Sequence, residues 1–190
     1  MNRGSFFLLM IWSIFFGCNA SAEDQPLWKT VGEWEVRVDL SLNNGCFVLA
    51  RYETGTFFRL GFNPPVGNAY IMFGSLDWQS LEHGKEYLIK IRFDDEEPWS
   101  GYATGTGLSK DLTALTLVVD EADFIREFMK KNVIVIEYRG KEISRLSLRG
   151  SFAAGMELLQ CQTEFDDHKN KKKKIDPFSN HSNKKDPFSS

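Results

Sequence analysis

The sequence has little of what metal sites, phosphate sites and nucleophilic catalysis require. Its three histidines and three cysteines include no C-x-x-C pair, and no histidine has a spacing that pairs it with another histidine or a cysteine on a metal. It also contains neither a G-x-S-x-G elbow nor a glycine-rich loop ending in Gly-Lys-Ser or Gly-Lys-Thr. We therefore expect no metal, no cofactor and no catalytic residue, which favours a non-enzymatic protein.

A hydrophobic run long enough to cross a bilayer is also missing. The apolar run from Phe6 to Phe16 has about 11 residues, whereas a spanning helix takes roughly 20. It follows a positively charged start and precedes Ala20-Ser21-Ala22, the small-residue pattern of a signal-peptide cleavage site. We predict a signal peptide over residues 1–22, cleavage after Ala22 and a periplasmic or secreted protein. The alternatives are an uncleaved anchor and a lipoprotein modified at Cys18.

The rest of the chain lacks the basic charge of a nucleic-acid-binding domain. Residues 23–168 carry a net charge of −9, which opposes contact with phosphates. The chain is 42% hydrophobic and 14% aromatic, enough to build a packed core. We expect residues 23–168 to form a single globular domain that does not bind nucleic acid.

Signal-peptide cleavage would leave two cysteines, Cys46 and Cys161. An even pair in an oxidising compartment predicts a structural disulfide. This bond would close a long loop and contribute up to roughly 4–5 kcal/mol on the chain-entropy model. Two free buried thiols are the alternative.

The domain is predicted to be β-rich, because apolar and polar residues alternate in many short segments. In the segment 33–40, for example, the even-numbered residues are apolar and the odd-numbered residues are charged. We expect strands over 33–40, 46–52, 57–62, 69–73, 87–93, 99–104, 112–119, 132–139 and 142–148, and helices over 121–131 and 152–162. The prediction is an α+β fold, an antiparallel meander of about nine strands with two short helices and one disulfide.

The last 22 residues, 169–190, differ sharply from the domain. They are rich in lysine and poor in aliphatic residues, so we expect a disordered tail. Asp-Pro-Phe-Ser occurs twice, at 176–179 and 186–189, which makes Phe178 and Phe188 candidate anchors for a partner. The lysines predict weak contact with anionic surfaces. A tail that only adds solubility is the alternative.

Three tryptophans are further candidates for partner contact. Trp28, Trp78 and Trp99 fall near strand ends or loops, where an indole ring can stack on a sugar or a peptide. Filling the core is the alternative for each of them. Carboxylate pairs for glycoside hydrolysis could come from a separate set of acids: Glu33, Glu35, Asp77 and Glu86.

Several short motifs are spread along the domain. In chain order they are Gly45-Cys46, Tyr52-Glu53-Thr54-Gly55-Thr56, Asp77-Trp78-Gln79-Ser80-Leu81, Gly84-Lys85-Glu86-Tyr87, Phe93-Asp94, Leu146-Ser147-Leu148-Arg149-Gly150-Ser151, Ala154 and Cys161. With them the chain resembles small exported alphaproteobacterial proteins of unassigned function, which are loosely similar to the invasion-associated locus B type. The resemblance implies a Gram-negative periplasm and carries over no catalytic residue.

Together these observations predict an exported, non-enzymatic binding or envelope-associated module. Its partner would be an unknown protein or glycan of the cell envelope, and the mature chain would have no transmembrane helix. The alternative function is an envelope glycan hydrolase that uses paired carboxylates, and a purely structural envelope role is also open.

Overall fold

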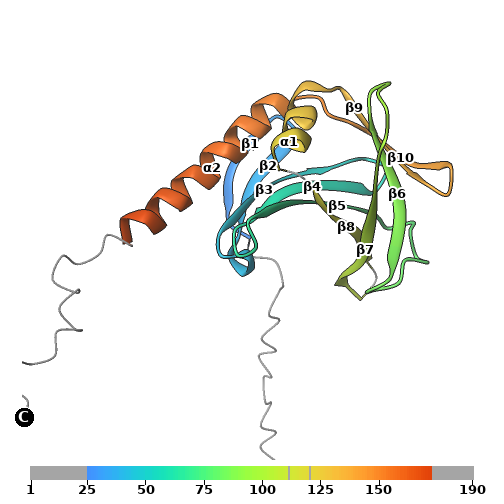
Figure 1. The fold of residues 1–190 in the computed structure, drawn as a ribbon, viewed down its shortest axis with the longest axis horizontal. Helices are drawn as coiled ribbons and strands as arrows, with labels where there is room; N and C mark the ends of the chain where they lie inside the picture. Colours follow the sequence, from blue (N-terminus) through green and yellow to red (C-terminus); the bar gives the residue numbers. More distant parts are fainter. Residues whose placement is uncertain (1–24, 111, 120, 173–190) are drawn as a thin grey trace, which may run out of the picture.

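The computed structural model describes residues 25–110, 112–119 and 121–172 (Figure 1). The predicted signal peptide, its cleavage site, and residues 173–190 of the predicted tail lie outside these residues. The strands are β1 Leu27–Val31, β2 Trp34–Asp39, β3 Gly45–Arg51, β4 Thr56–Asn63, β5 Asn68–Ser75, β6 Glu86–Phe93, β7 Trp99–Ser109, β8 Leu112–Val119, β9 Val133–Tyr138 and β10 Lys141–Ser147. The helices are the 3-10 turn η1 Leu40–Leu42, α1 Glu121–Lys130 and α2 Ser151–Lys172.

The predicted fold class is confirmed. All ten strands belong to one antiparallel sheet, and a disulfide joins Cys46 to Cys161. The strand absent from the sequence prediction is β1, which pairs with β2 at the edge of the sheet. Its sequence, LWKTV, does not alternate between apolar and polar residues, so the pattern does not predict a strand. In keeping with this, no residue of β1 is fully buried.

The order of the strands departs from a simple meander after β5. The order across the sheet is β1-β2-β3-β4-β5-β8-β7-β6-β9-β10. The chain leaves β5, passes to β6 three positions away and returns through β7 to β8, which pairs with β5. It then crosses by α1 to β9, beside β6. Figure 1 shows the strands curved around one interior, with α1 and the start of α2 at the same end.

The main core lies between the inner face of the sheet and the two helices. Trp34 of β2 packs edge-on against Phe128 of α1 with ring centroids 5.1 Å apart, and Phe58 of β4 stacks on Phe128 at 5.8 Å. The indole Nε1 of Trp34 donates a hydrogen bond to the carbonyl oxygen of Arg149 at 2.8 Å. The aromatic cluster therefore also fixes the turn that leads into α2.

Helix α2 is not short, as the sequence analysis expected, but runs ten residues beyond Gln162. The extension is polar, and its last four residues, 169–172, fall in the segment predicted to be a disordered tail; for these four residues the prediction is wrong, because they are helical. It contains no glycine or proline, and side-chain pairs four residues apart support it: Gln160 with Glu164, and Gln162 with Asp166.

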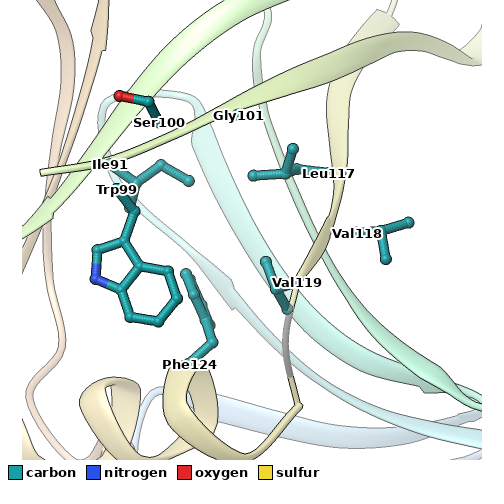
Figure 2. A pocket seen from close by; sticks show the side chains of 8 residues that line it. All are labelled: Ile91, Trp99, Ser100, Gly101, Leu117, Val118, Val119 and Phe124. Atoms are coloured by element: carbon teal, nitrogen blue, oxygen red, sulfur yellow. The ribbon is translucent and has the colours of Figure 1, made fainter.

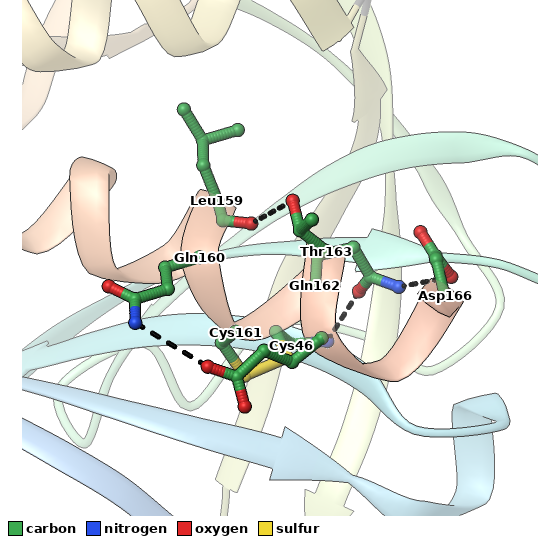
Figure 3. The surroundings of a disulfide bond; sticks show 8 residues. Cys46, Leu159, Gln160, Cys161, Gln162, Thr163 and Asp166 are labelled. Atoms are coloured by element: carbon green, nitrogen blue, oxygen red, sulfur yellow. Dashed lines mark hydrogen bonds between the residues drawn. A yellow bond between two sulfur atoms is a disulfide. The ribbon is translucent and has the colours of Figure 1, made fainter. Parts of the chain in front are cut away.

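Helix α2 is bound to the sheet at its middle (Figure 3). Cys161 forms the disulfide with Cys46 of β3, with the two Cα atoms 6.1 Å apart. The neighbouring Gln162 accepts a hydrogen bond at Oε1 from the backbone N–H of Cys46 at 2.9 Å. A covalent bond and a buried hydrogen bond therefore hold the same two positions together.

Removing the disulfide should destabilise the domain strongly. We expect Cys46→Ala/Cys161→Ala to lower the free energy of unfolding by about 3–4 kcal/mol, because the bond closes a loop of 115 residues in the unfolded chain. Urea unfolding of the chain from Glu23, with and without dithiothreitol, measures this. Dithiothreitol should lower the urea midpoint of the wild type and leave that of the double variant unchanged. A wild-type midpoint that is the same with and without dithiothreitol would contradict the prediction.

Candidate binding groove

A groove of about 780 Å³ lies on the face of the sheet opposite the main core. Residues of β3 alternate between the two faces: Cys46, Val48 and Ala50 belong to the main core, whereas Phe47 and Leu49 line the groove. The complete lining is Gln25, Phe47, Leu49, Arg51, Tyr52, Gly55, Thr56, Phe57, Arg59, Met72, Leu76, Leu108, Ser109 and Leu112. The groove thus crosses β3, β4 and β5 and reaches the hairpin between β7 and β8.

The floor of the groove is largely apolar. Leu49 of β3, Arg59 of β4 and Met72 of β5 face one another across the strands, in one row. Met72 belongs to a second, smaller apolar cluster with Tyr70 and Ala114, against which Phe57 packs. The central strands are therefore buried on both faces.

Arg59 brings a charge into this apolar floor. Its residue is only 9% exposed, and its guanidinium carbon lies 3.6 Å from the ring centroid of Phe47 and 5.2 Å from that of Tyr70. Nη2 donates to Asp39 Oδ2 at 2.5 Å, and Nη1 donates to Gln25 Oε1 at 3.4 Å. Among the described residues, Nε has no hydrogen-bond partner. Arg59 therefore keeps one buried donor free.

A glycine makes this stacking possible. Gly61 lies between Phe47 and Tyr70 in the cross-strand register. A Cβ atom at this position would come within 2.6 Å of Phe47 Cβ and 2.8 Å of Tyr70 Oη. Any larger residue would displace the two rings that flank the Arg59 guanidinium.

A second arginine, Arg51, lines the groove near the end of β3. Its Nη1 donates to Glu35 Oε1 at 3.1 Å, and Glu35 Oε2 in turn accepts from Arg37 Nε at 2.6 Å. Among the described residues, the charged ones of the groove lining are Arg51 and Arg59, and neither Glu35 nor Asp39 belongs to it. This described lining is therefore cationic, although residues 23–168 carry a charge of −9.

The acidic partners of these arginines stay ionised. Burial opposes the charge of Asp39, but hydrogen bonds from Ser41 and Arg59 outweigh it and hold the pKa of Asp39 below its ordinary value. Burial likewise opposes ionisation of Glu35, yet the hydrogen bonds from Arg37 and Arg51 lower its pKa. Burial raises the pKa of Tyr70 to about 12, so its hydroxyl is protonated at neutral pH.

The three candidate tryptophans lie outside the groove. Trp28 of β1 is half-buried against Phe165 of α2, with centroids 6.1 Å apart. Trp78, in the turn after β5, is half-buried against Phe73 at 6.2 Å. Trp99 is 38% exposed and lies beside Phe124 at a small apolar cavity of about 120 Å³ (Figure 2).

The candidate carboxylates are scattered over the domain, and the two candidate phenylalanines lie outside the described residues. Glu33, Asp77 and Glu86 are exposed, in the β1–β2 turn, after β5 and at the start of β6 respectively. Glu35 is tied into the arginine network just described. Phe178 and Phe188 lie outside the described residues. Across the described ranges, no three His, Cys, Asp or Glu side chains gather as metal ligands would.

Sequence reasoning missed every residue of this groove. Its apolar lining comes from strands that look like ordinary core strands, and its arginines look like ordinary surface charges. The available signal was Arg59 itself, a single charge in the otherwise apolar segment Phe57-Phe58-Arg59-Leu60. A long cation inside such a run indicates a paired, buried arginine.

The Asp39–Arg59 pair predicts acid sensitivity. Because the pKa of Asp39 is lowered on folding, its contribution is present above the unfolded value of 3.8 and is lost as the pH falls through the folded pKa. Asp39→Asn should lower the free energy of unfolding by about 3 kcal/mol at pH 7, because Arg59 then remains charged without its partner. Urea unfolding of both proteins from pH 7 to pH 2.5 should show this difference shrinking; a constant difference would contradict the assignment.

In the described part of the chain, no helix combines the length and hydrophobicity needed to cross a membrane. Neither a family model nor a curated protein matches the sequence. Among solved structures, the crystal structure of invasion associated protein B from Bartonella henselae is similar, with a TM-score of 0.54 and 10% identity over 71% of this chain and 97% of that one. The resemblance seen in the sequence is therefore confirmed, as a similarity of fold.

Proposed function

We propose that this protein is an exported, non-enzymatic binding module of the cell envelope, and that it binds its ligand in the groove on the outer face of the sheet. The observation that carries the proposal is the groove lining, which combines an open apolar floor with two arginines. The predicted signal peptide over residues 1–22 supports export. The disulfide between Cys46 and Cys161 supports an oxidising compartment such as the periplasm.

The size and chemistry of the groove suit a binding site. Ligand sites usually have volumes of about 300–1,000 Å³ and consist mainly of apolar groups with a few placed polar ones. The groove, at about 780 Å³, falls within this range. Seven of its lining residues are large and apolar: Phe47, Leu49, Phe57, Met72, Leu76, Leu108 and Leu112.

The same lining supports binding rather than hydrolysis by paired carboxylates. Glycosidases need two carboxyl groups facing the substrate. The part of the groove lining that the structure describes includes no aspartate or glutamate. Its polar groups are guanidinium, hydroxyl and amide groups, which orient a ligand without supplying a general acid.

A neutral dye tests the groove directly. The mature chain from Glu23 should enhance and blue-shift the fluorescence of Nile red, because an apolar groove removes the dye from water. Leu76→Glu/Leu108→Glu should weaken binding at least about tenfold, since burying unpaired carboxylates against an apolar ligand is costly. These leucines are 60% and 40% exposed, so the fold should tolerate the change.

The matched control is Leu88→Glu. Leu88 is 53% exposed on β6 and does not line the groove. This variant should bind the dye as the wild type does. No fluorescence change with the wild type, or equal weakening in both variants, would refute the proposed site.

A further inference from the structure

We infer that the ligand of this groove is a single-chain anionic amphiphile: an alkyl chain ending in a carboxylate, with the carboxylate at Arg51. The inference rests on the proposed function and names the chemical class that the site selects. Three features carry it: the placement of the two arginines, the excess of positive charge among the described residues around them, and the scarcity of polar partners for a peptide backbone.

The two arginines lie on neighbouring strands in one part of the groove. Arg51 lies opposite Phe57 in the β3–β4 register, and Arg59 is two residues further along β4 on the same face. Such diagonal neighbours have Cα atoms roughly 7–8 Å apart, within reach of two long side chains. The guanidinium group of Arg51 is bound to Glu35, and that of Arg59 is bound to Asp39 beside Phe47. A carboxylate at the exposed Arg51 would therefore also lie in the field of the second cation.

Charge favours an anion at this point. The local network holds three arginines, Arg37, Arg51 and Arg59, against two carboxylates, Glu35 and Asp39. Within the described part of the chain, this network is left with one positive charge, in a domain that is acidic as a whole. A guanidinium has five N–H donors, and among the described residues the exposed Arg51 uses one of them, Nη1, in a hydrogen bond to Glu35. A bound carboxylate would give Arg51 a further acceptor and balance the remaining positive charge.

The remainder of the groove favours an alkyl chain over a peptide. A buried peptide backbone must find partners for its N–H and C=O groups. Here β3, β4 and β5 are each paired on both sides, so their backbone groups are already used in the sheet. Beyond the arginines, the lining offers mainly side chains that need no hydrogen bond: Phe57, Met72, Leu76, Leu108 and Leu112. An alkyl chain fits this surface without any polar group to satisfy.

Binding of matched ten-carbon ligands tests the inference. Decanoate, decanol and decylammonium, each below its micellar concentration, are titrated against the mature protein from Glu23 with its tail, by displacement of Nile red. Decanoate should bind at least about tenfold more tightly than decanol, because charge-assisted hydrogen bonds form only with the anion. Decylammonium should bind most weakly.

Arg51→Gln should remove most of the preference for decanoate, because it weakens decanoate binding much more than decanol binding. Arg51 is suitable because its side chain is 57% exposed, so the fold does not depend on burying it. Arg145→Gln is the matched control: Arg145 is 53% exposed, also pairs with a glutamate, Glu142, and lies away from the groove on β10. It should keep the full preference. The lysines of the tail are the same in every variant, so any contribution they make to decanoate binding cancels when the variants are compared.

Failure of this inference differs from failure of the proposed function. If decanol and decanoate displace the dye equally, or if Arg51→Gln and Arg145→Gln behave alike, the anionic head group is refuted while the groove remains a binding site. If only a peptide with an apolar, free C-terminus displaces the dye, an alkyl ligand is refuted in favour of a peptide. If the wild type does not bind the dye at all, the proposed site itself is refuted.

Discussion

Arg59 is a permanent cation on a largely apolar sheet face, and the arrangement of that face follows from the need to neutralise it. Removing a guanidinium from water costs several kcal/mol unless it is paired and hydrogen-bonded. Asp39 supplies the charge, Gln25 a further acceptor, and Phe47 and Tyr70 the stacking surfaces. Residues from β2, β3, β5 and the chain before β1 are thereby gathered around one side chain of β4.

Asp39 also makes hydrogen bonds that connect the Asp39–Arg59 pair to the local backbone. Its Oδ1 accepts hydrogen bonds from the backbone N–H groups of Ser41 at 2.9 Å and Leu42 at 3.3 Å, and so caps the short helix η1 at the end of β2. Leu42 then packs against the small apolar cluster around Met72. The same carboxylate thus ends a strand, starts a helical turn and neutralises the groove arginine.

Much of the architecture could be predicted from the sequence because it depends on local patterns. Alternation identified β2 and β6, helical spacing identified α1, and the count of cysteines predicted the disulfide. The strand order could not be predicted, since β5–β8 and β6–β9 pairing depends on packing between distant segments. The groove was missed for a related reason: an apolar residue such as Phe47 has the same signature in the sequence whether it faces the main core or the opposite face.

The length of α2 has a mechanical consequence for the end of the chain. The helix is anchored by Cys161 and then by Phe165, which packs against Trp28, and it continues for seven more residues to Lys172. At 1.5 Å per residue, this last part is a stiff rod of about 10 Å that points away from the sheet (Figure 1). The point at which the chain continues beyond Lys172 is therefore held about 10 Å from the anchored part of the helix.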